Sequence, residues 1–203
     1  MNDARRPGRI SLVLPCFLAL LGCGSNNGVA SIDDARRAYL GLDDSIDKAI
    51  DLGFKGFNEA QSANIPAETE IGALSGVLTV TGQVDQGASA NKQMRLSLAM
   101  AMYSDILHFV YTTTGTGDAG TALPALDLSL QGIPTGTLSG TLAGTFQMSG
   151  DLSGPVTLNL TLSGDLESDV NGGASRVIRK PGSTHVTGTA TSPPGVFAVD
   201  VIK

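Results

Sequence analysis

The stretch Val156-Thr-Leu-Asn-Leu-Thr-Leu162 decides the fold of this chain. Its apolar and polar side chains alternate with a period of two, so on a β-strand the apolar ones share one face and the polar ones the other. One-sided alternation is typical of antiparallel strands with one buried and one solvated face. The same pattern recurs from Ile71 to the end of the chain, most clearly in 74–84, 94–102, 126–130 and 197–201. Because no helical pattern interrupts it, the sequence predicts about eight antiparallel strands within residues 70–203.

A local repeat of period four lies just upstream, in Gly136-Thr-Leu-Ser-Gly-Thr-Leu-Ala-Gly-Thr-Phe146. On a strand its three glycines share the buried face with Leu138, Leu142 and Phe146. Glycine inside a strand usually marks a bend or a close backbone approach. We therefore expect a strongly curved sheet whose glycines make room for a helix. The alternative is that the glycines have no packing role.

The helix is predicted in residues 31–64, where the apolar period changes to 3.6. Ser31 is a typical N-cap, and Asp33 and Asp34 follow in the first turn, where the helix dipole favours negative charge. The apolar stripe comprises Ile32, Ala35, Tyr39, Leu42, Ile46, Ala49, Gly53 and Phe57. Glycines within the stripe can interrupt it, so the pattern predicts one long helix or two consecutive ones.

The two parts together give the predicted fold: α+β, mainly β, with an N-terminal amphipathic helix packed on a curved antiparallel sheet. A coiled coil is the alternative use of the helical stripe, but the stripe lasts only a few turns and lacks sustained charged flanks. Residues 31–203 are expected to form one folding unit, in keeping with a chain of 203 residues.

The N-terminal residues have the three parts of a secretion signal. Arg5, Arg6 and Arg9 precede the apolar run Ile10–Leu21, which is shorter than the roughly 20 residues that span a bilayer. The sequence Leu20-Leu21-Gly22-Cys23 then resembles the lipobox of bacterial lipoprotein precursors. The resemblance implies a signal peptide over residues 1–22, cleavage after Gly22, and lipid attachment at Cys23. Residues 23–30 are expected to be a flexible tether.

Two alternatives compete with this interpretation: a membrane-spanning segment, and an ordinary secretory signal that leaves Cys23 as a free thiol. Under the lipoprotein interpretation Cys16 is discarded and Cys23 is blocked, so no internal disulfide is expected. Gly24 follows the lipidated position; in enteric bacteria Asp there favours the inner membrane, so the outer membrane is the expected destination.

The net charge of the chain argues against some classes of binding partner. Removal of residues 1–22 takes away three arginines and one aspartate, which changes the net charge from -6 to -8. An acidic body argues against nucleic-acid binding and against broad electrostatic adhesion to anionic lipid. The membrane partner is therefore expected to be held through the N-terminal lipid.

Several patterns resemble reactive or binding motifs, but their context does not fit. The run 115–120 matches a dinucleotide-binding loop, yet a predicted strand follows it, whereas that motif opens a helix. His108, expected in an apolar strand, and His185 have no second metal ligand at a suitable spacing. Residues 169–173 lack the later Glu of a calcium loop. Arg176, Arg179 and Lys180 form a basic cluster expected at a solvated hairpin tip.

The sequence thus predicts no catalytic residue, metal site or cofactor. The expected function is that of a lipid-anchored, non-enzymatic structural or interaction module of the cell envelope, with an envelope protein as a possible partner. The alternative is a carrier of a hydrophobic ligand such as lipid between helix and sheet. It is suggested by the Met-bearing strand Met94–Met102 and by the low aromatic content of 4%.

Overall fold

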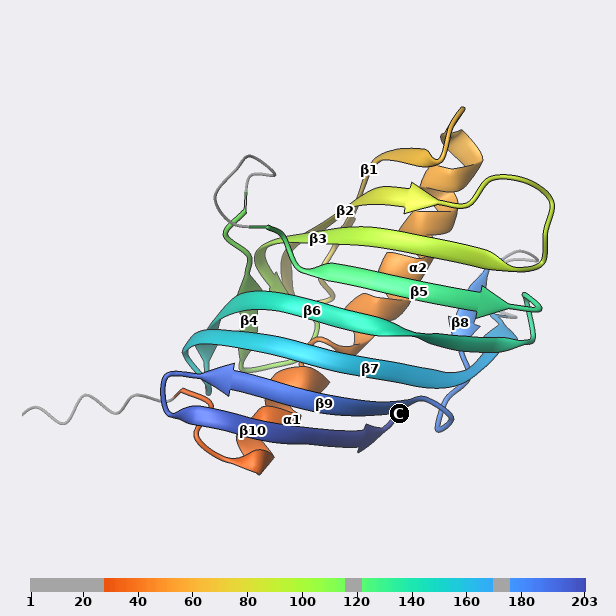
Figure 1. Ribbon diagram of the computed structural model, residues 1–203. Helices are drawn as coiled ribbons and strands as arrows, with labels where there is room; N and C mark the ends of the chain where they lie inside the picture. The colour runs from red at the N-terminus through yellow and green to blue at the C-terminus, as the bar shows by residue number, and fades with distance from the viewer. Residues whose placement is uncertain (1–27, 116–121, 170–175) are drawn as a thin grey trace, which may run out of the picture.

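A computed structural model describes residues 28–115, 122–169 and 176–203 (Figure 1). It contains two consecutive helices, α1 (Ile32–Leu40) and α2 (Asp43–Glu59), packed on one face of an antiparallel sheet. The strands are β1 (Asn64–Ile71), β2 (Ser75–Val84), β3 (Lys92–Ser104), β4 (Phe109–Thr112), β5 (Ala125–Gln131), β6 (Thr137–Gly150), β7 (Gly154–Ser168), β8 (Val177–Arg179), β9 (His185–Ser192) and β10 (Gly195–Ile202). The predicted α+β, mainly β fold is confirmed.

The sheet is a meander with one insertion. Its order is β1-β2-β3-β4-β6-β7-β9-β10, and every neighbouring pair is antiparallel. β5 lies between β3 and β6 along one half of their length, while β4 bridges the same two strands at the other half. β8 pairs only with the end of β7. β4 and β8 have four and three residues, too few to produce a recognisable alternation.

The helical segment ends earlier than the sequence suggested. α2 stops at Glu59, and β1 starts at Asn64, inside the range assigned to the helix. Pro66, which follows the predicted helical segment, lies within β1. β1 pairs only with β2, and an edge strand tolerates proline because one of its sides makes no ladder hydrogen bonds.

α1 begins as the sequence predicts. Ser31 Oγ accepts a hydrogen bond from the Asp34 amide at 3.0 Å, which caps α1. α1 ends at Gly41, and α2 continues through Gly53 and Gly56 without a break. α1 packs against β10, whereas α2 packs on the same face of the sheet against β1, β2, β3 and β8.

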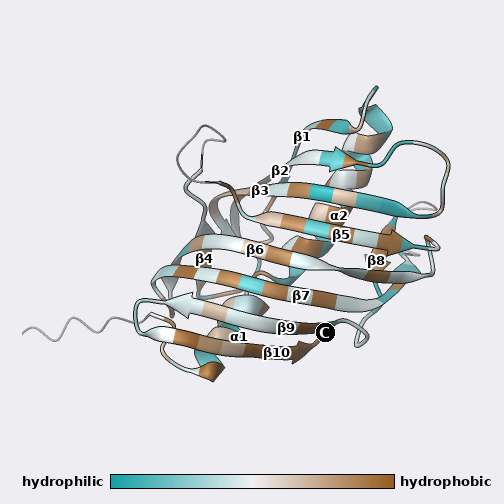
Figure 2. Ribbon diagram, viewed as in Figure 1, coloured by the Kyte–Doolittle hydropathy of each residue, from teal (hydrophilic) through white to brown (hydrophobic). Residues whose placement is uncertain are grey.

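The core fills the space between the helices and the concave face of the sheet. Along β6 and β7 the buried positions alternate with exposed ones, as predicted, and Figure 2 shows the resulting bands of hydropathy. Tyr111 and Phe146 meet edge to face, with ring centroids 6.3 Å apart. The largest fully buried side chains include Tyr39, Ile46, Ile50, Leu78, Met94, Leu96, Leu98 and Leu126.

The expectation that the β6 glycines make room for a helix is wrong. A Cβ atom at Gly140 would lie 2.2 Å from the Asp127 carbonyl oxygen in β5, so this glycine permits a close approach between neighbouring strands. The helix supplies the room instead. A Cβ at Gly56 would lie 2.9 Å from Ile65 Cβ in β1, and at Gly53 the nearest atoms would be those of β3 at 3.4 Å.

Candidate functional sites

The residues predicted to carry the anchor, Gly22 and Cys23, lie outside the described residues, as does Cys16. Their roles stay predictions. Most of the rejected dinucleotide-binding pattern, 116–120, and of the rejected calcium loop, 170–173, also lies outside. The strand expected after the dinucleotide-binding pattern is present as β5.

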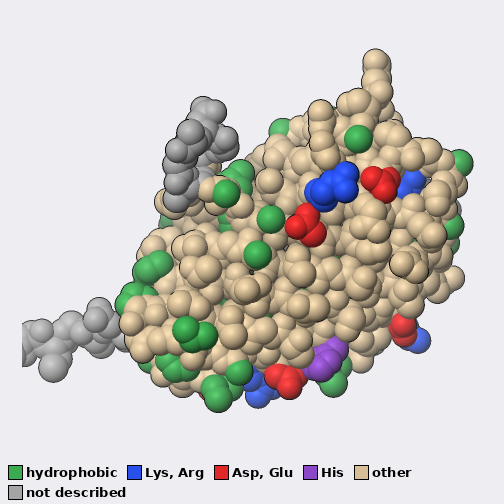
Figure 3. Space-filling model, viewed as in Figure 1, with side chains coloured by type: hydrophobic (Ala, Val, Ile, Leu, Met, Phe, Trp, Pro, Cys, Tyr) green, Lys and Arg blue, Asp and Glu red, His purple; other side chains and the backbone are tan. Residues whose placement is uncertain are grey.

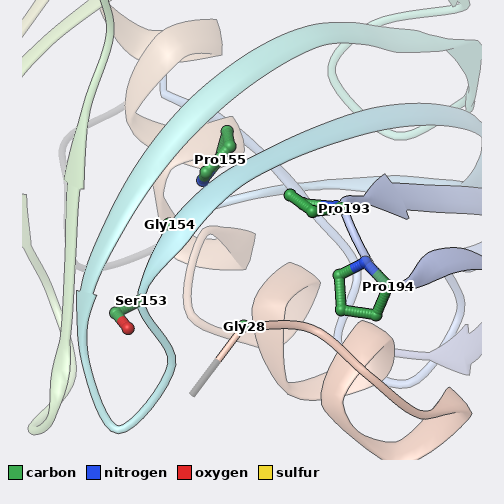
Figure 4. Close-up of a pocket in the computed structure, with 6 residues that line it drawn as sticks. All are labelled: Gly28, Ser153, Gly154, Pro155, Pro193 and Pro194. Atoms are coloured by element: carbon green, nitrogen blue, oxygen red, sulfur yellow. The ribbon is translucent and has the colours of Figure 1, made fainter. Parts of the chain in front are cut away.

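The first described residues are held firmly to one end of the sheet. Val29 is buried, and its carbonyl accepts a hydrogen bond from the Ser192 hydroxyl at the end of β9. Beside this point lies a surface cleft of about 400 Å³ between the β6–β7 and β9–β10 turns (Figure 4). Its lining residues are Gly28, Ser153, Gly154, Pro155, Pro193 and Pro194.

Four turns follow one another along this end of the sheet, and we call them the N-terminal rim: residues 72–74, 105–108, 151–153 and 193–194. Backbone hydrogen bonds connect part of this border: the Leu74 amide donates to the Ser104 carbonyl at the end of β3, and the Asp151 amide donates to the His108 carbonyl. The last two turns of the rim flank the cleft described above.

The rim and the strand ends next to it are rich in exposed apolar side chains. Eight large hydrophobic residues of the described chain are exposed, and six of them belong to this end. These six are Ile71, Leu74, Val77, Met102, Leu107 and Val196. Single exposed apolar residues are ordinary, but a group confined to one end of a domain points to an interaction surface.

The prediction that the basic cluster lies at a solvated hairpin tip is wrong for Arg179, which is buried, whereas Lys180 is exposed next to a turn. Its side chain is 5% exposed and donates to Asp43 Oδ1 at 2.9 Å and Oδ2 at 3.1 Å. It also donates to Asp47 Oδ1 at 2.9 Å and Oδ2 at 2.8 Å, and to the Asp43 carbonyl at 2.9 Å. Asp43 is buried as well, because the guanidinium holds its carboxylate against the sheet.

Tyr39, Asp43, Asp47 and Arg179 form a charged cluster, and the contacts within it influence the protonation states of its members. Burial acts to raise the pKa of Asp43, but the hydrogen bonds from Arg179 prevail and hold that pKa below its usual value. Tyr39 donates its hydroxyl to Asp43 Oδ1 at 2.5 Å, and burial together with this carboxylate raises the pKa of Tyr39. A carboxylate with this many donors is a poor base, so the arrangement suits a structural tie between α2 and β8 rather than proton transfer.

The two histidines lie apart from this cluster. His108 occupies a turn with φ 72° before β4 and is largely exposed, so the prediction that it lies within a strand is wrong. The apolar residues next to it gave the turn the appearance of a strand in the sequence. His185 pairs across β9 and β10 with Asp200, at 2.8 Å. Among the described residues, no three His, Cys, Asp or Glu side chains group as metal ligands.

The face of the sheet opposite the helices carries short hydroxyl side chains in register. Thr145, Thr157 and Thr191 align across three strands, and the first two are hydrogen-bonded at 2.8 Å. Two further rows are Thr141-Thr161-Thr187 and Ser139-Ser163-His185. Figure 3 shows that charged and hydrophobic side chains are sparse over the middle of this face. The alternation of the strands predicted its polarity, but only the register reveals the rows.

The helix–sheet interface holds protein side chains where a ligand carrier would need space. The Met94 sulfur and a Leu96 methyl group both lie 3.4 Å from the Cβ position of Gly53, and both residues are buried. Met102, at the end of the same strand, is exposed instead. Met94 therefore packs against α2, whereas Met102 lies at the surface.

Neither helix in the described part of the chain is long and apolar enough to cross a membrane. Comparisons with protein-family models, with curated protein sequences and with solved structures find no match to this chain.

Proposed function

We propose that this protein is a lipid-anchored, non-enzymatic module of the bacterial cell envelope, tied to the outer membrane through Cys23. The observation that carries the proposal is the sequence Leu20-Leu21-Gly22-Cys23, which follows a basic segment and a short apolar run. In lipoprotein precursors this pattern directs lipid to the cysteine and cleavage to the preceding bond.

Two features of the folded domain support this proposal. The described domain begins at Gly28, five residues after Cys23, so an anchor there would attach directly to a packed structure. Asp43 and Asp47 of α2 are both paired with Arg179 of β8, an arrangement that suits a structural role. The packed helix–sheet interface gives the alternative, a carrier of hydrophobic ligand, no comparable support.

The anchor can be tested by metabolic labelling in a bacterial host with a radiolabelled fatty acid. We expect label on the wild-type protein, none on Cys23→Ser, and undiminished label on the matched control Cys16→Ser. Two or three acyl chains hold a protein far more firmly than the marginal grip of one, so the wild type should remain with the membrane fraction while Cys23→Ser is released. Absence of label from the processed wild-type chain would refute the proposal.

A further inference from the structure

We infer that the N-terminal rim is a membrane-docking surface, so that the domain meets a phospholipid bilayer end-on. The inference rests on the proposed lipid anchor at Cys23. It goes further because it assigns the face of the folded domain that contacts the lipid headgroups.

The first argument is the reach of the chain. Gly28 lies five residues after Cys23, and an extended chain spans at most about 3.3–3.6 Å per residue, or about 18 Å in total. β7 alone has 15 residues and rises about 3.3 Å per residue, so the sheet is more than twice as long as this reach. An anchor at Cys23 therefore cannot let the far end of the sheet face the membrane while the N-terminal end points away.

The second argument is the distribution of apolar surface. Six of the eight exposed large hydrophobic side chains in the described chain belong to the N-terminal end. Leu107 is 69% exposed and Val196 is 64% exposed, and both flank the region where the chain begins. Figure 3 shows hydrophobic side chains gathered at this end of the sheet. Transfer of such side chains from water to the acyl boundary of a bilayer is favourable in free energy.

The third argument is the contrast in charge between the two ends. On the rim, Asp151 is paired with Arg37 at 2.8 Å, and the Arg37 guanidinium also lies 5.2 Å from the Phe109 ring centroid. The opposite end carries the charged cluster together with Asp165, Glu167 and Lys180 beside it. The carboxylates of Asp43, Asp44, Asp47, Asp165 and Glu167 outnumber the cations of Arg179, Lys180 and Lys203 at that end. The rim carboxylates Asp105 and Asp151 are each paired with a cation, so an anionic membrane would repel the opposite end more than the rim.

The experiment uses the full-length, lipidated protein in vesicles of phosphatidylcholine and phosphatidylglycerol. Single cysteines labelled with an environment-sensitive fluorophore are placed on the rim with Val196→Cys and Leu107→Cys. Matched controls are Thr135→Cys at the far end, on the β5–β6 turn, and Thr161→Cys in the middle of the hydroxyl-bearing face. All four positions are at the surface or in a turn of the described structure.

We expect blue-shifted emission, and quenching by doxyl-labelled phosphatidylcholine, at positions 196 and 107 but not at 135 and 161. Equal quenching at 161 would mean that the domain lies flat, and water-like emission at every position would mean that it stands clear of the lipid. Either result overturns the inference. The parent protein without an added cysteine separates this failure from failure of the proposed function: if Cys23 carries lipid, the parent takes up no thiol label, and if it does not, the parent is labelled.

Discussion

Arg179 offers the sharpest test of how the helix is tied to the sheet. In Arg179→Met the aliphatic part of the side chain is kept, while five hydrogen bonds to Asp43 and Asp47 are lost. Asp43 is left 4% exposed, with Tyr39 and the more distant Lys203 amine as its remaining partners. In this variant the buried Asp43 carboxylate therefore loses most of the hydrogen bonds that offset its desolvation.

Breaking a buried ion pair from one side costs about 3–5 kcal/mol, because the remaining charge stays desolvated. Asp47 contributes less to this cost, since its side chain is 30% exposed and water can replace the guanidinium. A domain of this size is stable by about 5–15 kcal/mol, so Arg179→Met should remove a large fraction of the free energy of unfolding. The second variant, Asp43→Asn in the Arg179→Met background, should be more stable than Arg179→Met alone by about 1 kcal/mol or more, because no buried charge remains.

The assay is urea-induced unfolding followed by circular dichroism at neutral pH. Arg176→Met is the matched control: its side chain is 34% exposed and pairs with Asp51 and Asp169 at 3.3 and 3.4 Å, so its loss should cost under about 1 kcal/mol. The reasoning is refuted if Arg179→Met costs no more than this control, or if adding Asp43→Asn destabilises the protein further.

Three further outcomes are expected, all measurable by the same unfolding experiment. Gly56→Ala should lower the free energy of unfolding by about 1–3 kcal/mol, because its methyl group would overlap β1. Gly53→Ala faces flexible side chains and should be neutral or stabilising by up to about 1 kcal/mol. Equal effects of the two substitutions would contradict the packing described for α2. Tyr111→Phe should cost about 0.5–1.5 kcal/mol, since the buried hydroxyl donates to a helix carbonyl at 2.8 Å, and an unchanged midpoint would show that this bond contributes nothing. The pKa values of Asp43 and Asp105 are lowered by their cationic partners despite burial. The stability that these carboxylates contribute is therefore present above their pKa in the unfolded chain, about 3.9, and is lost as the pH falls through their pKa values in the folded protein. A urea midpoint that stays constant well below pH 4 would argue against this.

The contrast between Arg179 and the leucines of β7 shows what could be predicted. The leucines obey a local period, so their burial follows from the sequence pattern alone. Arg179 is separated from Asp43 by 136 residues, and no local pattern connects them. Read locally, a basic residue next to a Pro-Gly turn looks solvated, and only the packing of α2 beside β8 turns it into a buried ion pair.

The glycines of β6 also show which features a local sequence pattern can predict and which it cannot. Their period in β6 correctly predicts that they share a face with buried side chains, but not which neighbour approaches them. That neighbour is β5 for Gly140, whereas Gly56 of α2 permits the close approach of the helix to β1. The partner of a close contact depends on strand order, which the sequence period does not contain.

The sequence by itself determined the class of fold, the helix N-cap at Ser31, the alternation of the strands and the predicted anchor at Cys23, because each rests on residues close together in the chain. Only the tertiary structure decided the insertion of β5 beside β4, the buried pairing of Arg179, the rows of hydroxyl side chains and the gathering of apolar residues on one rim. These features join residues far apart in the chain. Their energies depend on burial and register, which exist only once the sheet has closed over the helices.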